Sequence, residues 1–497
     1  MSKFIERVTS IAKASVNKHG RSMLGWGRDA ITGREMVRIA ILGSKKAGKS
    51  VMLTAIQNYL KYLASKDDYD ESSLESKMLS DDGWRVVSVV NRLPKVWEDF
   101  NYGYNREKLC HVTDADEGWP DETEKARCMQ MDIDLKQHDG KDAKNRFLTV
   151  QILDIPGERF SDLGTMYGRD YQAWCDLLCE NHHDKSTCAR PWKEYEDRVK
   201  KTLEEVGDNK DVESFIKQCR DAYEDFVMLQ AKSFSPFVTP SGFLLPNTSG
   251  KTNAAEPMDK PFPCPLIPLT DAVFKSKRQL ARKAIKKMRK EYNRYKQEYE
   301  LDKLANWLGS AHQLYYLVDV LGILMNGKGA FEGARAQCEM VLQNFMHGNP
   351  SVFGRSWRFL FKTSLRRAYG IATQIDRVLS ADHANIEGLL RILMKRHLGD
   401  LGCIHDILSC AAVKSTREAD GKLAGNFKKN RLRKKTEGDN YGADPDYRPM
   451  PVPAKWDFSE NCDYHWKFPE PLEFPEYESV NPPNTNLKEI VKKMILP

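Results

Sequence analysis

The sequence lacks several features that would place the chain in a membrane or outside the cell. It has no apolar run of about 18 residues, the length needed to cross a bilayer as a helix. Its 11 cysteines include no CxxC pair and no spacing typical of a secreted disulfide framework. The first residues, MSKFIERVTSIAKASVNK, lack the apolar stretch and cleavage site of a secretory signal. We therefore expect a soluble, cytoplasmic protein.

A strong excess of charge is also missing. The chain of 497 residues contains 77 Lys and Arg residues and 70 Asp and Glu residues, which gives a net charge of +7. This permits acidic partners, but we expect no specific nucleic-acid binding from so small an excess. The length exceeds what one core usually organises, so the chain has two or more domains, or one domain with large insertions.

A glycine-rich motif lies between a predicted strand and a predicted helix. Met36–Leu42 (MVRIAIL) is apolar and rich in β-branched residues, and VMLTAIQNYLKYL follows the motif with helical spacing. The motif between them, GSKKAGKS, matches G-x-x-x-x-G-K-[ST] at every fixed position. This pattern predicts a phosphate-binding P-loop. Its expected nucleotide-binding residues are Gly43, Ser44, Lys45, Lys46, Ala47, Gly48, Lys49, Ser50 and Val51.

Each fixed position of the motif has a physical role. Gly43 and Gly48 allow the backbone to curl, so that successive N–H groups point at phosphate oxygens at a helix N-terminus. The Lys49 ammonium is expected to contact the β- and γ-phosphates, and the Ser50 hydroxyl to bind Mg²⁺. The alternative interpretation is an ordinary glycine turn before a helix.

A second strand supplies the acidic residue that a P-loop requires. Phe147–Leu153 is followed by Asp154, which is an expected magnesium ligand. The sequence DIPGERF, which begins at Asp154, matches the D-x-x-G turn of GTPases. The Gly157 N–H is expected to sense the γ-phosphate. Glu158 stands where many GTPases hold a glutamine that positions water, and either a catalytic or a structural role fits a carboxylate there.

A switch threonine is expected upstream of this strand. Cys128–Leu135 alternates as an edge strand should, and QHDGKDAKN forms a predicted hairpin turn to the strand that ends at Asp154. Thr123 is the candidate for contact with magnesium and the γ-phosphate. Thr113 is its rival.

Further strands predict the base-binding side of the site. They are Leu314–Val318, followed by a helix over Phe331–Phe345, then Tyr369–Thr373 and Ile407–Ala412. In IATQIDRV, Thr373 and Asp376 fit the [NT]-K-x-D pattern, in which the carboxylate accepts two guanine N–H groups. Gln374 replaces the lysine. A helix N-cap is the alternative role of Asp376, and the backbone N–H of Val413 is a candidate partner of the guanine carbonyl.

Taken together, these segments resemble the YcjX-like family of bacterial P-loop GTP-binding proteins, described as stress-induced. The similar segments are ILGSKKAGKSVMLTAI, WPDET, LDIPGERFSDL, DYQAW, FVTPSGFLLP, FPCPLIPL, LVDVLGILMNGKGAF, IATQIDRV and LSCAAVKST. The resemblance implies a GTPase-type core with helical insertions and GTP or GDP with Mg²⁺ as ligands. It also implies the roles given above for Lys49, Ser50, Thr123, Asp154, Gly157 and Asp376.

The fold class expected is α/β: a P-loop NTPase with a doubly wound, mostly parallel sheet and large, mainly helical insertions. The expected organisation is an N-terminal amphipathic segment (1–36), core segments (37–63, 121–171 and 311–416), a polar, irregular insertion (64–120), a mainly helical insertion (172–310), and a C-terminal basic loop, strap and helix (417–497).

Three further segments outside the glycine-rich motif have a distinctive pattern of residues. The N-terminal amphipathic helix is expected to pack on the protein itself, with peripheral membrane contact as the alternative. Lys275–Tyr299 is interpreted as a solvated basic helix with a tyrosine seam, and an RNA or membrane surface is the alternative. The group Cys175, Cys179, His182, His183 and Cys188 contains zinc-type ligands, but its spacing favours packing on a helix.

These observations predict a slow, magnesium-dependent GTPase, a regulatory or stress-related switch whose helical insertion is available to a protein partner. An ATPase of the same fold and a nucleotide-dependent binding module without hydrolysis are the alternatives. Arg127, Arg159 and Arg169 lie near the predicted switches, but the sequence identifies no arginine finger among them.

Overall fold

The computed structural model describes most of the chain in separate ranges. These are residues 33–43, 47–65, 79, 83–110, 125–137, 144–157, 159–183, 189–206, 211–232, 239–243, 264–347, 367–395, 404–427, 442–443, 447–459, 463–469 and 484–496. The predicted N-terminal amphipathic helix and the hairpin turn at 138–143 lie outside these residues.

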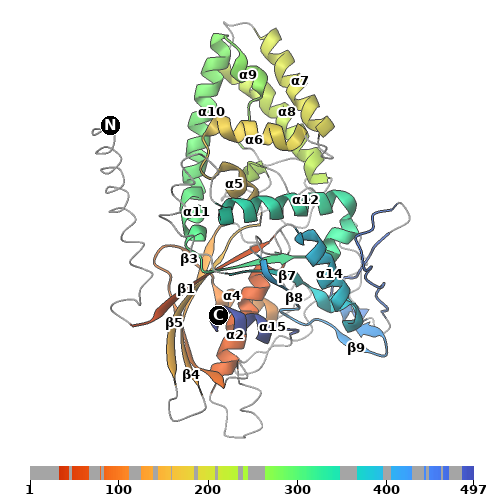
Figure 1. Cartoon of the computed structure of the whole chain (residues 1–497). Coiled ribbons are helices and arrows are strands. Elements are labelled where there is room, and N and C mark those ends of the chain that lie inside the picture. Colours follow the sequence, from red (N-terminus) through yellow and green to blue (C-terminus); the bar gives the residue numbers. More distant parts are fainter. Residues whose placement is uncertain are drawn as a thin grey trace.

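A central sheet organises the described part of the chain (Figure 1). Its path is β2-β4-β5-β1-β6-β7-β8, and β3 pairs with β4 off this path. The strands are β1 (Glu35–Gly43), β2 (Trp84–Arg92), β3 (Glu98–Asp99), β4 (Arg127–Gln137), β5 (Asn145–Asp154), β6 (Gln313–Val318), β7 (Arg367–Thr373) and β8 (Ile404–Cys410). Small two-stranded pairs follow: β9 (Arg417–Ala419) with β10 (Lys422–Ala424), and β11 (Asn426–Phe427) with β12 (Gly442–Ala443).

The sheet is mixed but mostly parallel. Strands β5, β1, β6, β7 and β8 are parallel neighbours, whereas β4 runs antiparallel to both β5 and β2. Because parallel strands end on the same side of a sheet, the loops after β5, β1, β6, β7 and β8 gather along one edge. We call this the carboxyl edge.

Strand β1 shows why the sheet has helices on both faces. Ile39 and Ile41 lie in one apolar cluster and Ala40 and Leu42 in the other, and all four are 0% exposed. A strand buried on both sides has a continuous apolar sequence, as MVRIAIL has. The fold is therefore α/β with three layers.

The helices divide between these layers. On the face of Ile39, α2 (Lys49–Ala64), α4 (Tyr102–Cys110) and α15 (Leu487–Ile495) contribute to the core. The other cluster contains residues of α5 (Arg159–Met166), α11 (Leu301–Gly309), α12 (Val320–His347) and α14 (His383–Leu393). None of the helices described is long and apolar enough to cross a membrane.

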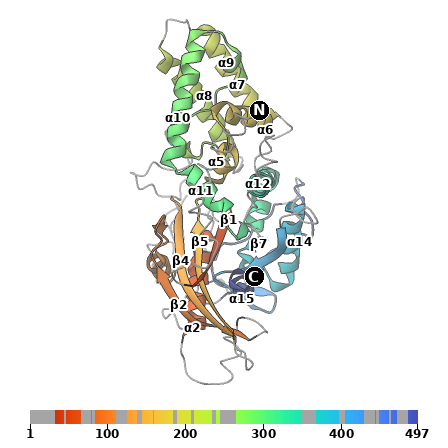
Figure 2. The same ribbon diagram turned by 60° about the vertical axis from the view of Figure 1, so that its left-hand side comes forward.

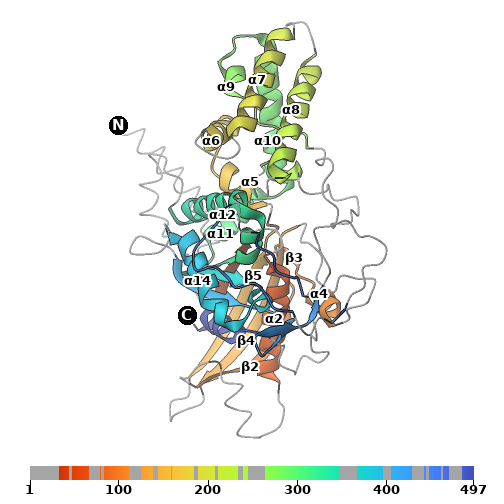
Figure 3. The same cartoon turned by 90° about the vertical axis from the view of Figure 1, so that its right-hand side faces the viewer.

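A bundle of helices stands above the carboxyl edge. It consists of α6 (Tyr171–His183), α7 (Ala189–Glu205), α8 (Val212–Lys232), α9 (Asp271–Lys275) and α10 (Gln279–Glu298), and we call it the helical bundle. Its core is aromatic, with Trp174, Trp192, Tyr195, Tyr223 and Tyr292 buried. Helix α5 lies between the helical bundle and the sheet in every view (Figure 1, Figure 2 and Figure 3).

Several expected elements are confirmed. The helix after the glycine motif, the strands ending at Asp154, Val318 and Thr373, and the antiparallel pairing of the strand at Cys128 all occur. The tyrosine seam of the basic helix is also present, because Tyr292 and Tyr295 are 1% and 3% exposed.

The expectation of an edge strand at Cys128–Leu135 is wrong. This segment forms β4, and β2 pairs with it on the side away from β5. Strand β2 comes from the insertion 64–120, which was expected to be polar and irregular. The register of β2 shifts between Val86 and Ser88, and Val87 and Val90 are each 45% exposed. The shift breaks the alternation of apolar and polar residues that identifies a strand in a sequence.

Two boundaries also differ from the expectation. Helix α12 begins at Val320 rather than Phe331, with a break at Gly327, where φ is 77°. Strand β8 covers Ile404–Cys410 instead of starting at Ile407. The glycines in LGILMNGKGAF obscure the first turns of α12, because glycine is a poor helix former.

The C-terminal helix α15 is part of the core. Its residues Leu487, Ile490, Val491 and Met494 are 0–1% exposed, and α15 packs beside α2. The Gln313 side-chain amide on β6 donates a hydrogen bond of 3.0 Å to the carbonyl of Met494. Helix α15 therefore completes one face of the sheet.

We expect Ile490→Ala to destabilise the protein by about 2–5 kcal/mol, because it leaves a cavity at a fully buried position. Chemical denaturation followed by circular dichroism measures the change in unfolding free energy. Lys488→Ala, at an exposed position of the same helix, is the control and should change it by less than about 0.5 kcal/mol. Equal effects of the two substitutions would contradict the packing of α15.

Candidate functional site

The candidate site lies along the carboxyl edge, where strand register brings the predicted residues together. Ile41 of β1 pairs with Asp154 of β5, and Gly43 pairs with Leu317 of β6. On the other side of β6, Val318 pairs with Ala372 of β7. The glycine motif, the acidic strand end and the base-binding turn, which are hundreds of residues apart in the chain, therefore share one edge.

The two glycines of the motif occupy positions that disfavour other residues. A Cβ on Gly43 would lie 2.5 Å from the Leu317 carbonyl oxygen, and its φ is 156°. Gly48 has a left-handed backbone, with φ of 79°, and is the N-cap of α2. The Lys49 ammonium, 7% exposed, donates to the carbonyl of Gly43 at 3.1 Å. Ser44, Lys45 and Lys46 lie outside the described residues.

Two of the expected magnesium ligands, Ser50 and Asp154, are in direct contact. The Ser50 hydroxyl lies 3.0 Å from Oδ2 of Asp154, which is 0% exposed. A hydroxyl and a carboxylate are hard oxygen donors, and Mg²⁺ in phosphate sites needs only one or two such protein ligands. The donor set thus fits this cation.

The turn after Asp154 leads directly into α5. Gly157 is buried, and the N–H of Arg159 donates to the Pro156 carbonyl at 3.0 Å. Val51 continues α2 behind the motif. The switch candidates Thr123 and Thr113, and the catalytic candidate Glu158, lie outside the described residues.

Two of the three arginines near the switches are used within the structure. Arg159 is 5% exposed and is held by α10 and the segment at Ser241, as described below. Arg169 donates to the carbonyls of Gly164 and Thr165 near the end of α5. Arg127 is half-buried at the start of β4, opposite Asp154.

The base-binding turn follows β7. The Asp376 carboxylate is 8% exposed and accepts the backbone N–H of Ser415 at 2.8 Å, while the Thr416 hydroxyl donates to the Asp376 carbonyl at 2.6 Å. Val413 is buried two residues before Ser415. The turn after β8 is thereby fixed against the turn after β7.

The alternative role of Asp376 as a helix N-cap is wrong. The N-cap of the short 3₁₀ helix Ile375–Arg377 is Gln374, with a left-handed φ of 59°, and Asp376 lies inside that helix. Burial raises the pKa of the Asp376 carboxyl above its usual range, and the Ser415 N–H opposes this rise. Thr373 donates to the carbonyl of Val318 at 3.3 Å, which links β7 to β6.

Arg377 is a site residue that no sequence pattern identifies. Its guanidinium is 3.5 Å from Asp319 at the end of β6 and 3.7 Å from the centre of the Phe468 ring. It also donates to the carbonyls of Trp466 and Lys467, and Nη1 lies 3.4 Å from the side-chain oxygen of Gln374. Arg377 therefore joins the base-binding turn to the C-terminal segment 463–469.

Three members of the cysteine and histidine group, Cys175, Cys179 and His182, are packed into the helical bundle. Cys175 is buried, the Cys179 thiol contacts Glu196 at 3.2 Å, and the His182 ring lies 4.8 Å from that of Trp192. Among the residues described, no group of three His, Cys, Asp or Glu is arranged to hold a metal ion. Cys188 lies outside them.

The chain is similar to a known family along most of its length. A family model described as "YcjX-like family, DUF463" matches residues 37–495. The chain is 24% identical over 394 residues to a protein of Escherichia coli (strain K12) named "Ras-like GTPase YcjX", a match that covers 76% of this chain and 78% of that protein. It is 23% identical over 396 residues to a protein of the same name from Shewanella oneidensis, covering 77% of each. Because the family model matches nearly the whole sequence, the chain belongs to the YcjX-like family.

Proposed function

We propose that this protein binds GTP with Mg²⁺ and hydrolyses it slowly to GDP and phosphate, as a regulatory or stress-related switch. The observation that carries the proposal is the contact of Ser50 with Asp154 on the same edge as the Asp376 turn. The names of the two relatives, which call them Ras-like GTPases, support the choice of guanine nucleotide.

The phosphate end of the site uses charge and backbone amides. The Lys49 ammonium donates to the Gly43 carbonyl, and a phosphate oxygen is a stronger partner for an ammonium than a neutral carbonyl. Gly43, Ala47 and Gly48 keep the backbone N–H groups at the N-terminus of α2 close to the phosphates. Ser50 and Asp154 would hold Mg²⁺, which offsets negative charge on the β- and γ-phosphates when bound.

The base end uses Asp376 as its selective group. An ionised carboxylate can accept both ring-edge N–H groups of guanine, a pairing that adenine does not offer. The Ser415 N–H holds Oδ2 of this carboxylate, so its orientation is set before the nucleotide arrives. Thr373 fixes the start of the turn, Gln374 stands at the usual lysine position, and the N–H of Val413 is proposed to meet the guanine carbonyl.

Hydrolysis would depend on positioning. Gly157 is proposed to contact the γ-phosphate, Thr123 to complete the magnesium and γ-phosphate contacts, and Glu158 to orient the attacking water. Arg159 and Arg169 are engaged in structural contacts. Without an arginine that stabilises the transition state, turnover is slow, since such a residue contributes about 10³–10⁵ in rate.

We expect phosphate release from GTP with a kcat on the order of 10⁻⁴ to 10⁻² s⁻¹ in the presence of Mg²⁺. Lys49→Ala should abolish both this release and measurable GTP binding, while Lys200→Ala, an exposed position on α7, should leave both unchanged. A phosphate-release assay and fluorescent-nucleotide titration provide the data. Binding without release would indicate a nucleotide-dependent binding module, and preference for ATP would indicate an ATPase.

We expect Asp376→Asn to weaken GDP binding by roughly 10- to 150-fold, the loss expected for charged hydrogen bonds of about 1.5–3 kcal/mol. The amide can instead donate to xanthine, so binding of xanthosine diphosphate should improve. Asp420→Asn is the matched control, because Asp420 is exposed and has a left-handed φ of 51° that Asn also accepts. Unchanged affinity of Asp376→Asn for GDP would remove Asp376 from the base site.

We expect GDP affinity to fall as pH is lowered, beginning at a higher pH than an ordinary Asp would cause. The Asp376 pKa is raised by burial, and only the ionised carboxylate accepts two guanine N–H groups, so affinity is present above this pKa and is lost below it. Titration of GDP binding from neutral to acidic pH is the measurement. The affinity of Asp376→Asn for GDP should vary with pH only through ionisation of the phosphates. If the unmodified protein and Asp376→Asn showed the same pH dependence, Asp376 would not be the group that binds guanine.

A further inference from the structure

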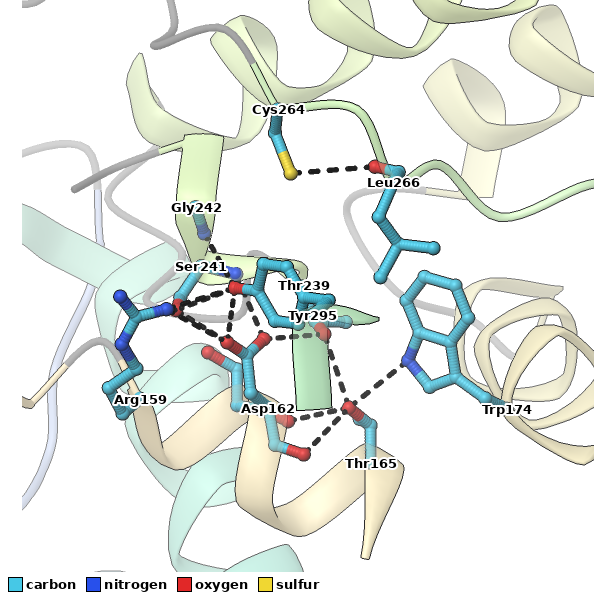
Figure 4. Close-up of polar contacts among 11 residues, drawn as sticks. Arg159, Asp162, Thr165, Trp174, Thr239, Ser241, Gly242, Cys264, Leu266 and Tyr295 are labelled. Atoms are coloured by element: carbon cyan, nitrogen blue, oxygen red, sulfur yellow. Dashed lines mark hydrogen bonds and ion pairs between the residues drawn. The ribbon is translucent and has the colours of Figure 1, made fainter. Parts of the chain in front are cut away.

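A buried carboxylate lies at the junction between the Gly157 turn and the helical bundle. Asp162, on α5, is 0% exposed. Its Oδ1 accepts the Thr239 hydroxyl at 2.9 Å and the Ser241 N–H at 2.8 Å, and its Oδ2 accepts the Ser241 hydroxyl at 2.5 Å and the Tyr295 hydroxyl at 2.7 Å (Figure 4). All four donors come from the segment 239–243 or from α10, so the Asp162 carboxylate joins α5 to the region of the helical bundle.

Arg159, the first residue of α5, belongs to the same cluster. Its Nη1 donates to the Ser241 hydroxyl and to the Tyr295 hydroxyl, each at 2.9 Å, and lies 3.5 Å from Asp162. Its guanidinium carbon is 3.5 Å from the centre of the Tyr299 ring. Arg159 stands only two residues after Gly157, so its anchoring is directly linked to the turn expected to sense the γ-phosphate.

The hydroxyl of Tyr295 is the central bridge. It donates to Asp162 and accepts from Arg159 and from the N–H of Gly242 at 2.9 Å, so every hydrogen-bonding capacity of the oxygen is used. Burial raises the pKa of Tyr295 well above its usual range, which keeps the donated proton on the hydroxyl.

The other end of α5 is tied to the helical bundle as well. The Thr165 hydroxyl lies 3.2 Å from that of Thr239 and accepts the Trp174 indole N–H at 3.3 Å. The Tyr292 hydroxyl donates to the carbonyls of Met166 and Arg169, each at 3.2 Å. Contacts at both ends therefore join α5 to α6 and α10.

A buried ionic cluster of this kind does not stretch gradually. Separating Asp162 from its donors leaves an unpaired buried charge, so the cluster is either fully formed or rearranged as a unit. Packed elements that are joined in this way shift together between discrete arrangements.

We propose that Arg159, Asp162 and Tyr295 are positioning residues that couple the nucleotide state of the Gly157 turn to the conformation of the helical bundle. The proposal rests on the proposed GTP-binding function and adds its output. A change at the turn that repositions α5 is transmitted to α6 and α10, and by thermodynamic reciprocity a protein bound to the helical bundle alters nucleotide affinity.

Hydrogen exchange of the full chain tests the coupling, with Mg²⁺ and either GDP or a non-hydrolysable GTP analogue. The readout is exchange in α7 and α8, which lie in the helical bundle away from the carboxyl edge (Figure 2). We expect rates that differ between the two nucleotides by about 5- to 150-fold, the usual range for coupled sites. Tyr295→Phe should lose this difference while still binding both nucleotides.

Tyr195→Phe is the matched control. Tyr195 is also buried, and its hydroxyl donates to the Pro268 carbonyl within the region of the helical bundle, without contact to α5. It should keep the nucleotide-dependent difference. Ser241→Ala, a smaller change that removes a hydroxyl donor to Asp162, should reproduce the loss if Tyr295→Phe does not fold.

The outcomes separate the two proposals. A difference retained in both Tyr295→Phe and Ser241→Ala, or absent from the unmodified protein although both nucleotides bind, overturns the coupling alone. Failure of the unmodified protein to bind any guanine nucleotide overturns the proposed function, and the coupling with it.

Discussion

The contact between Ser50 and Asp154 is the constraint on which the rest of the structure depends. A carboxylate that is fully buried requires a strong partner, and here that partner comes from a helix that starts one turn after the neighbouring strand. The parallel pairing of β1 with β5 sets the relative height of the two residues. Only a glycine at position 43 lets β6 approach closely enough to extend the same edge toward the base-binding turn. Strand order, glycine positions and helix placement thus all serve one alignment of polar groups in an apolar sheet.

Much of this alignment could be predicted from the sequence, because each part of the site is recognised from a short, continuous sequence motif. Strand, loop and helix follow one another around Lys49, Asp154 is the last residue of β5, and Asp376 lies three residues after the end of β7. A mostly parallel sheet could be predicted as well, since these strands are separated by long connections. The contacts between residues far apart in the chain could not be predicted. Arg377 and Phe468, or Asp162 and Tyr295, are far apart in the chain and share no spacing rule, and the bulge in β2 hides the alternation of its residues.

The two ends of the site differ in how the protein fixes them. At the proposed phosphate end, Lys49 donates to the Gly43 carbonyl at the end of β1, and Ser50 of α2 contacts Asp154 at the end of β5. At the base end, Asp376 is held by the loop after β8, and the adjacent Arg377 by the segment 463–469. The residue at the usual lysine position, Gln374, lies within reach of the same guanidinium. The proposed base end is therefore held by segments from the C-terminal part of the chain, whereas the described contacts at the proposed phosphate end come from β1, α2 and β5.

The position of α15 has a consequence for biosynthesis. Its apolar side covers a part of the sheet beside α2, more than 400 residues after β1 in the chain. As the polypeptide leaves the ribosome, the first strand and helix emerge long before this covering layer exists. Until residue 495 is made, the part of this face of the sheet that α15 covers stays open to solvent and to chaperones. A chain that stalls earlier exposes that apolar surface to cellular quality control.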